Sequence, residues 1–456
     1  MTEVSPAQHG IWINERAGAW SAYHMPLVIR FGAPVDEGAL AKAVAALVER
    51  HPLLGAAFEE RDGLPSLVPA AEPPFLAREE VKGPFDLAKG PLVRFALQGD
   101  ELRVEAHHAV FDGQSKEVLV ADLLALYRGE VLPALPPLAP REAPAEEARA
   151  FWASRWRAPE EVVVPGGVLR SRRASPGRVL EFTLDVPEAE GLTRFEVLLA
   201  AVHAVLASYG NAAPVTAIDL STRTPGQEGH IGPFVTELPV FSAPEHGTPF
   251  GRFALALRAE LREVYRHRQV PLARAVPGLR PHAALAPVSV SYRRGGQDDR
   301  VEWLAFNQAV RGALQLQLLD RPSGLVASLR HDPDELPDPE RVVADLRSWL
   351  SGDLSRPLST TQAPPPASAP APVAVASGQE RRVEGDPLLA GITAIWEEVL
   401  QLSPIEPDDD IFDLGGHSLT ITQIIARMRK RLDVEVELDD FFDNPTIAGV
   451  IGVIRQ

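Results

Sequence analysis

The chain has 456 residues, of which 45% are hydrophobic, and this composition fits a globular protein of two to four domains. Its formal net charge of −17 argues against non-specific binding to nucleic acid. It contains no cysteine, which excludes disulfides, thiolate metal sites and a cysteine nucleophile, and is typical of a cytoplasmic protein.

The N-terminal third mixes helical and strand patterns. The first residues lack the basic stretch and apolar run of a secretory signal, and no apolar run in the chain is long enough to cross a bilayer. Apolar spacing predicts helices over residues 36–51 and 114–128. Between them, alternating residues on both sides of a Gly-Asp turn predict a hairpin over residues 93–106. Continuing that alternation would put His108 on the apolar face and His107 on the opposite face.

A second set of similar patterns begins near residue 178. RVLEFTLDVP alternates as a strand, residues 195–209 form an apolar helix, and VTAIDL reads as another buried strand. Strands accompanied by helices therefore occur twice along the chain. This repetition predicts a mixed α/β (α+β) fold with two similar layered halves rather than one continuous sheet.

The C-terminal part is separated by a segment of unusual composition. Residues 357–385 are rich in Pro, Ala and Ser and have almost no bulky apolar side chains, so we expect a semi-extended linker. Apolar residues spaced by three and four then predict helices after residue 386 and after residue 418. Asn444 followed by Pro445 predicts the start of a last helix that ends near Ile454. These three or four short helices would form a small bundle.

The sequence HHAVFDG contains the first candidate site. Adjacent histidines on a strand point to opposite faces, so His107 and His108 are a poor pair of ligands for one metal, and we expect no metal site. A neutral imidazole at His108 could accept a proton from an attacking amine or alcohol. Asp112 could orient the imidazole or fix the loop, and Gly113 permits a tight turn. By itself this pattern fits a structural loop histidine equally well.

Five further segments accompany this one in a fixed order. They are SPAQHGIW (5–12), ERHPLLGAAF (49–58), PFDLAKGPLVRFAL (84–97), STRTPGQEGHIGPFVTELPV (221–240) and HRQVPLA (267–273). With HHAVFDG they resemble the motifs of condensation domains from non-ribosomal peptide synthetases. The chain departs from the family at Thr236, where asparagine is usual, and at residues 282–293, which replace a downstream motif.

The resemblance implies a fold and a set of residue roles. The domain would consist of two chloramphenicol-acetyltransferase-like halves, residues 1–170 and 171–356, with a tunnel between them. His108 would be the catalytic histidine and His107 a structural one. Asp112 would form a buried salt bridge, for which Arg223 is our candidate partner. Gly113 would offer its backbone N–H near the reacting carbonyl.

The second candidate site is Ser418, in the sequence DIFDLGGHSLTITQIIARM (410–428). A serine after Gly-Gly at a helix start is a common N-cap, but free N–H groups and the helix dipole there also favour a phosphate ester. The whole segment resembles the 4'-phosphopantetheine attachment site of peptidyl carrier proteins. We therefore predict a four-helix carrier domain over residues 386–456, and a cofactor that supplies the thiol missing from the chain.

Together the two resemblances imply peptide-bond formation between carrier-bound thioesters. The expected partners are a phosphopantetheinyl transferase, a separate adenylating enzyme, and an upstream donor carrier protein or acyl thioester. Two alternatives stay open. The chain could be an ester-forming or chain-releasing acyltransferase that uses a soluble alcohol or amine, or the first domain could be an inert docking scaffold for the carrier.

Overall fold

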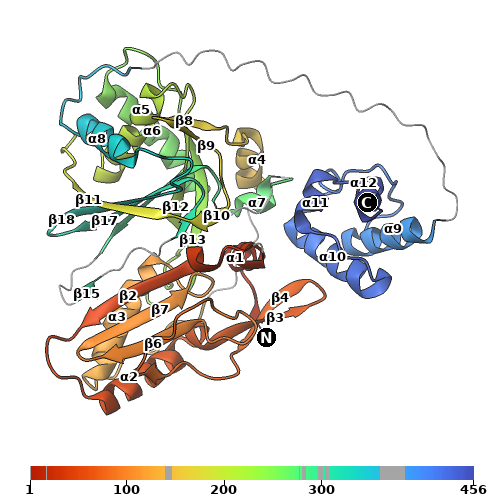
Figure 1. Ribbon diagram of the computed structural model, residues 1–456, viewed down its shortest axis with the longest axis horizontal. Helices are drawn as coiled ribbons and strands as arrows, with labels where there is room; N and C mark the ends of the chain where they lie inside the picture. Colours follow the sequence, from red (N-terminus) through yellow and green to blue (C-terminus); the bar gives the residue numbers. More distant parts are fainter. Residues whose placement is uncertain are drawn as a thin grey trace.

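The computed structural model describes residues 2–16, 18–138, 146–276, 278–279, 284–295, 301–302, 309–359 and 386–455. Three bodies are visible in Figure 1: two α/β halves that face each other, and a helical bundle beside both. The mixed α/β class predicted from the sequence is confirmed. Among the described residues, no helix is both long and apolar enough to cross a membrane.

The first half is built on a five-stranded sheet with the strand order β15-β2-β7-β6-β5. The predicted hairpin is present, and the two predicted helices pack together against the sheet. The bounds of these elements are β2 His24–Arg30, α2 Glu37–Arg50, β5 Leu76–Ala77, β6 Val93–Gln98, β7 Glu101–His107, α3 Gly113–Tyr127 and β15 Val301–Glu302. Asp36 caps α2 by accepting a hydrogen bond from the N–H of Ala39, which explains why that helix starts where it does.

Smaller elements of the first half surround this sheet. They are β1 Thr2–Glu3, α1 Pro6–Arg16, the 3-10 helices η1 Trp20–Tyr23 and η2 Pro52–Gly55, and the hairpin β3 Ala56–Arg61 with β4 Leu64–Pro69. Helix α1 begins with a reciprocal pair of hydrogen bonds between Ser5 and Gln8. The amide of Gln8 also donates to the carbonyl of Ala109 at 3.0 Å. The SPAQ segment therefore attaches α1 to the loop that carries the paired histidines.

The second half is built on a six-stranded sheet with the order β11-β18-β17-β14-β12-β13. Its strands are β11 Arg178–Leu184, β12 Val215–Ser221, β13 Val235–Phe241, β14 Val288–Arg294, β17 Leu314–Arg321 and β18 Gly324–His331. Its main helices are α5 Arg194–Ser208, α6 Phe250–Arg266 and α8 Pro339–Trp349, with the short α7 Leu272–Ala275. Helix α5 is buried on every side because it lies between this sheet and its neighbours α6 and α8.

The division between the halves lies earlier than the expected 170/171 boundary. Helix α4 (Glu146–Arg155) and strands β8 (Val162–Val164) and β9 (Gly167–Leu169) pack into the core of the second half. Trp152 of α4 is 1% exposed and donates its indole N–H to the carbonyl of His267. Periodicity along the chain cannot show this, because these elements reach the second core only through tertiary packing. The second half is completed by β10 (Ala174–Pro176) paired with β16 (Ala309–Arg311).

The expected linker begins two residues too early. Pro357 forms a bridge with Pro249, and Leu358 is 1% exposed, so both belong to the second half. The rest of the expected linker, residues 360–385, lies outside the described residues.

The C-terminal bundle consists of α9 Pro387–Leu400, α10 Ser418–Leu432, α11 Leu438–Asp443 and α12 Ile447–Ile454. The predicted start of the last helix at Asn444 is wrong. Thr446 is the N-cap and accepts a hydrogen bond from the N–H of Gly449, whereas Asn444 closes α11. Because Asn-Pro and Thr are all good helix-start signals, the sequence alone selected the wrong one.

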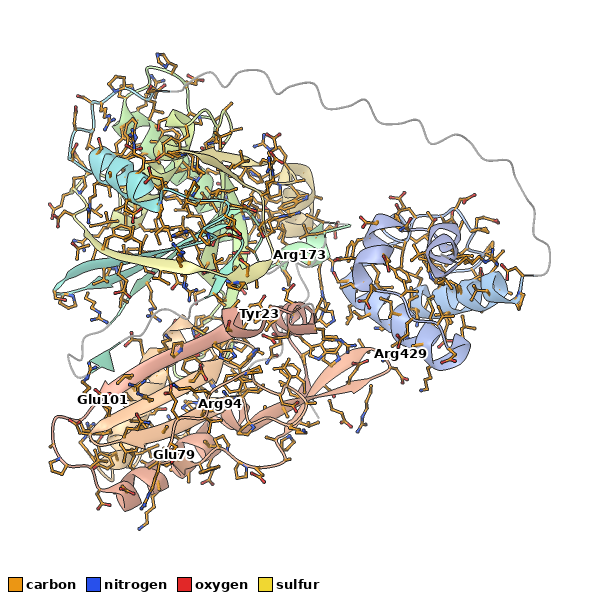
Figure 2. All side chains as sticks on the ribbon, viewed as in Figure 1. Tyr23, Glu79, Arg94, Glu101, Arg173 and Arg429 are labelled. Atoms are coloured by element: carbon orange, nitrogen blue, oxygen red, sulfur yellow. The ribbon has the colours of Figure 1, made fainter. Side chains whose placement is uncertain are left out.

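The bundle contacts both halves near α1, α7 and the β3–β4 hairpin (Figure 1). Among the described residues, three ion pairs cross this boundary: Lys430 with Asp62 at 2.8 Å, Arg429 with Glu60 at 3.3 Å, and Arg173 with Asp439 at 2.8 Å. Figure 2 shows Arg173 and Arg429 at the edge of the bundle. The hairpin turn fits closely, because a Cβ on Gly63 would lie 2.3 Å from the carbonyl oxygen of Thr422.

Candidate active site

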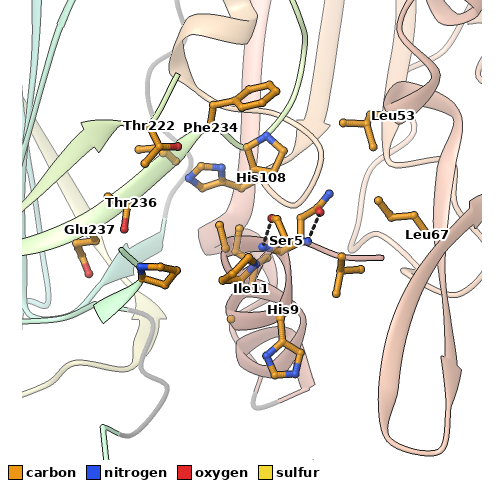
Figure 3. Close-up of a pocket in the computed structure, with 18 of the residues that line it drawn as sticks. Ser5, His9, Ile11, Leu53, Leu67, His108, Thr222, Phe234, Thr236 and Glu237 are labelled. Carbon is orange, nitrogen blue, oxygen red and sulfur yellow. Dashed lines mark hydrogen bonds between the residues drawn. The ribbon is translucent and has the colours of Figure 1, made fainter. Parts of the chain in front are cut away.

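A cavity of about 2160 Å³ lies where the three bodies meet, and we call it the central cavity. Its lining includes His108 and Leu53 from the first half and Thr222 and Thr236 from the second. Figure 3 shows His108 between α1 and the strands of the second half. Ser418, at the start of α10, lines the same cavity. The structure therefore brings the two sites predicted from separate motifs into one space.

The geometry of His108 leaves one ring nitrogen available to a substrate. Its Nδ1 lies 2.7 Å from the carbonyl oxygen of Phe111, and since a carbonyl can only accept, Nδ1 carries the proton. Burial, followed by the nearby Arg311 guanidinium, lowers the pKa of His108. The imidazole is therefore neutral near pH 7, with the lone pair on Nε2 free to accept a proton.

His107 has a different environment. The expected alternation would have placed it on the face opposite the core, but its side chain is 1% exposed. Strand β7 ends at His107 and the chain turns at once, so the alternation does not continue to His108. The Nε2 of His107 donates to Glu15 at 3.1 Å, and its Nδ1 accepts from the N–H of Ala109. Both ring nitrogens are thus engaged within the protein.

Asp112 joins the two halves of the molecule. Its Oδ1 accepts from the N–H of Ser115 at 2.7 Å and so caps α3. From the second half, Arg223 donates to both carboxylate oxygens at 3.0 and 3.1 Å, and the N–H of Phe234 donates at 3.0 Å. The side chains of Asp112 and Arg223 are 4% and 5% exposed. This buried pair is the contact anticipated from the resemblance.

Gly113 is the first residue of α3, and its carbonyl accepts a hydrogen bond from Arg293 at 2.8 Å. Arg293 also lies 3.2 Å from where a Cβ on Gly113 would be, so a larger residue would displace it. Gly113 is not among the described residues that line the central cavity. Gly113 therefore leaves room for the Arg293 side chain to pack against the start of α3.

An ionic cluster on the second half was missed by the sequence analysis. Asp219 of β12 and Glu237 of β13 are direct cross-strand partners, so their carboxylates share one face of the sheet. Arg311 lies 3.5 Å from Asp219, and all three residues line the central cavity. Burial raises the pKa of Glu237 to about 7, and its buried Oε1 has no hydrogen-bond partner among the described residues. Strand pairing brings Asp219 and Glu237 together, and tertiary packing of β16 adds Arg311.

Ser418 begins α10, where the chain turns sharply. Gly415 has φ of 85°, and a Cβ on Gly416 would lie 2.6 Å from the carbonyl oxygen of Ile411. The serine is 9% exposed in this docked arrangement. His417 is the N-cap, and its Nδ1 accepts from the backbone N–H of Thr420. This helix start, with cationic groups of the cavity nearby, suits a phosphate ester.

No group of three or more His, Asp or Glu side chains in the described part of the chain is arranged to hold a metal ion. The residues that surround Ser418 fit a phosphopantetheine group in two ways. Ser418 is the first residue of α10, at the positive end of the helix dipole, and it lines the same cavity as His108.

Two family models match the chain. The model for the condensation domain matches residues 74–292, and the model for the phosphopantetheine attachment site matches residues 390–454. The chain therefore carries a 4'-phosphopantetheine attachment domain after a condensation domain.

Similar proteins agree with this arrangement. The chain is 28% identical over 417 residues to the probable nonribosomal peptide synthetase CymA of Salinispora arenicola, a match that covers 76% of this chain and 5% of CymA. Its carrier region is 43% identical over 65 residues to a plipastatin synthase of Bacillus subtilis, which covers 14% of this chain and 2% of that protein. The chain thus spans a small part of these relatives.

Solved structures show the same fold. One is the first condensation domain of the calcium-dependent antibiotic synthetase in complex with a substrate analogue, with a TM-score of 0.63 and 18% identity. The match covers 79% of this chain and 98% of that one. At this level of identity the likeness concerns the fold alone.

Proposed function

Since this chain is a condensation–carrier didomain of the nonribosomal peptide synthetase family, we propose that it forms an amide bond between a donor acyl thioester and an aminoacyl group held at Ser418. The observation that carries the proposal is the shared cavity: His108 and Ser418, more than 300 residues apart in sequence, line the same space. A group tethered at Ser418 is thereby confined near His108, and such confinement replaces a bimolecular encounter.

Phosphopantetheine on Ser418 supplies a flexible thiol that the cysteine-free chain lacks. In the condensation step the acceptor amine attacks the thioester carbonyl of the donor. A C–N bond forms, the C–S bond breaks, and the donor's thiol leaves. His108 Nε2 takes the proton that the amine loses and returns it to the departing sulfur, so the imidazole ends the step neutral.

The other residues have supporting roles in this proposal. His107 is structural, because both of its ring nitrogens bond to protein atoms. Asp112 and Arg223 hold the two halves at a fixed spacing around the cavity. We assign Gly113 to the close fit of α3 against Arg293, and because it does not line the central cavity within the described residues, we give its backbone N–H no part in the condensation step.

The partners follow from what lies between the two domains. The segment from residue 360 to 385 is far too short for an adenylating domain, so the amino acid is loaded by an adenylating enzyme that is not inserted there. A phosphopantetheinyl transferase modifies Ser418, and the donor arrives on another carrier protein or as a soluble acyl thioester. We place this chemistry in the cytoplasm, where coenzyme A and adenylating enzymes are present.

Intact-mass measurement tests the direction of transfer. The protein with phosphopantetheine and an aminoacyl group on Ser418 is mixed with a donor thioester, and the mass on the protein is followed. We expect the donor acyl group to appear on Ser418 as an amide. If the product is instead released with a soluble amine or alcohol and Ser418 ends empty, the chain-releasing alternative is correct. If the wild-type protein forms no product with a donor thioester that another condensation enzyme does use, the docking-scaffold alternative is favoured.

A further inference from the structure

The contact between the bundle and the two halves contains a group of basic side chains next to Ser418. His9 comes from α1, Arg274 from α7 and His417 from the start of α10, and all three line the central cavity together with Ser418. No step of the condensation described above uses them. They lie on three elements that meet only when the bundle is docked.

His9 is the most enclosed member of this group. It is 7% exposed and stacks on Trp12 with 6.1 Å between the ring centroids. Its Nε2 is buried without a hydrogen-bond partner among the described residues. Burial first, and then Arg274 and His417, lower its pKa to about 4. A buried ring nitrogen without a partner is costly, which points to a ligand that completes the site.

Arg274 and His417 present donors to the same region. Arg274 is exposed, and no hydrogen bond or ion pair is seen for its guanidinium within the described ranges. The Nδ1 of His417 accepts from Thr420, so in the neutral ring the proton is on Nε2, which is free to donate. The two side chains that act electrostatically on His9 are thus both basic, and no carboxylate of the described residues acts on it with them.

The start of α10 adds backbone donors. The helix has 15 residues, and the N–H groups of Ser418 and Leu419 precede its first internal hydrogen bonds. An anion bonded to the oxygen of Ser418 would therefore lie against the positive end of the helix dipole.

We propose that His9, Arg274 and His417, with the N-terminal N–H groups of α10, bind the phosphodiester of the arm on Ser418 when the carrier is docked. Because the phosphate is attached directly to the serine, it stays at this mouth of the cavity while the thiol end reaches toward His108. The clamp would make docking depend on the modification, so that the unmodified carrier competes weakly for the cavity. The proposal rests on the proposed function to the extent that Ser418 must carry the arm.

The first test measures the pKa values of the His9 and His417 imidazoles in the unmodified and the modified protein. Ser418 is modified with a transferase and coenzyme A, complete modification is confirmed by intact mass, and the His9 and His417 side chains are titrated by NMR. A phosphodiester adds a negative charge, so we expect the pKa of His9 to rise by about one unit or more from its value near 4. The Ser418→Ala protein, treated in the same way, should not change.

The second test measures docking directly. Since the chain has no cysteine, spin labels can be placed at Leu255→Cys in α6 of the second half and at Leu402→Cys in the connection between α9 and α10 of the bundle, both of which are exposed. We expect modification to increase the ratio of docked to undocked molecules about tenfold, as for a hydrogen-bonded charge. Arg274→Ala and His9→Phe should each remove most of that gain. Arg149→Ala, which removes an exposed cation from another part of the same cavity, should retain it.

The outcomes separate the clamp from the proposed function. If Ser418 accepts no arm, the carrier assignment itself fails. If Ser418 is modified but the pKa of His9 stays near 4, or Arg274→Ala docks as well as Arg149→Ala, the clamp is refuted and the carrier assignment stands.

Discussion

At the scale of single residues, the chemistry of this protein depends on how each imidazole and carboxylate is held. His107 and His108 are neighbours in sequence, yet one has both ring nitrogens bonded within the protein and the other has one nitrogen facing the cavity. The difference arises because β7 ends between them. The same logic separates Asp112, which is fully paired, from Glu237, whose Oε1 has no partner in the described chain.

Replacing His108 should abolish most of the condensation activity. We expect His108→Ala to lower the rate by roughly 10²–10⁴-fold, the usual contribution of a positioned proton acceptor. Modification of Ser418 should be unchanged, because the serine is in another domain. The rate is measured as acyl transfer onto Ser418 by intact mass. His230→Ala is the matched control, since His230 lines the same cavity but its ring bonds to the carbonyl of Pro136. Equal rates for the two variants would contradict the assignment.

Glu237 should make the stability of the protein depend on pH. Its pKa is about 7 in the folded protein against an ordinary value of 4.5, so folding favours the protonated form. The contribution of Glu237 to the free energy of unfolding is fully present below pH 4.5, and it is lost as the pH rises to about 7. We therefore expect the free energy of unfolding of Glu237→Gln, relative to that of wild type, to increase by up to about 3 kcal/mol between pH 4.5 and pH 8. This figure follows from about 1.36 kcal/mol per pKa unit.

Urea unfolding of both proteins at pH 4.5, 6 and 8 measures this difference. The exposed Glu245 provides a control, and Glu245→Gln should follow wild type at every pH. A difference between Glu237→Gln and wild type that does not vary with pH would show that Glu237 is ionised throughout this range.

At the scale of elements, the start of α3 connects the two halves of the condensation domain. Asp112 caps this helix and, through Arg223 and the N–H of Phe234, attaches it to the second half. Removing the carboxylate therefore affects a helix end and the contact between the halves together.

We expect Asp112→Ala to destabilise the protein by about 3–5 kcal/mol, because the buried Arg223 would lose its counter-charge. The double variant Asp112→Ala with Arg223→Leu should lose less free energy of unfolding than the two single variants together, since neither charge is left unpaired. Thermal and urea unfolding measure both. As a control, Glu263→Ala, which breaks an exposed pair with Arg266, should cost no more than about 0.5 kcal/mol. If Asp112→Ala and Glu263→Ala lose similar amounts of stability, the buried pair does not connect the two halves as we infer.

At the scale of the whole molecule, we expect docking of the carrier to determine which of the proposed reactions Ser418 can undergo. In the docked arrangement Ser418 is 9% exposed and faces the cavity, so a transferase or an adenylating enzyme needs the carrier to leave. In the part of the chain that the structure describes, the boundary is formed by three ion pairs and the fit of Gly63 against Thr422. Exposed pairs contribute little each, which keeps this contact reversible.

Charge reversal at the boundary should separate loading from condensation. Lys430→Glu places a carboxylate opposite Asp62 at the hairpin turn. We expect modification of Ser418 to become about two- to fivefold faster and condensation to slow by a similar factor, which corresponds to the small energy of an exposed pair. The double variant Lys430→Glu with Asp62→Lys should restore both rates. Rates that are unaffected in the single variant would show that this contact is not used in solution.

The sequence by itself determined what is encoded locally. The hairpin of β6 and β7 and the helices α2, α3, α5, α9 and α10 follow from spacing and caps, because neighbouring residues determine these features. Contiguous motifs singled out His108, Asp112 and Ser418, and their expected roles came from the resemblance of those motifs to known families. Tertiary structure alone decided which core α4 joins, how Asp219, Glu237 and Arg311 meet, and that His9, Arg274 and His417 surround Ser418. Such contacts depend on strand pairing, tertiary packing and domain docking between residues that are not neighbours in the chain, and no local pattern of hydrophobicity or charge records them.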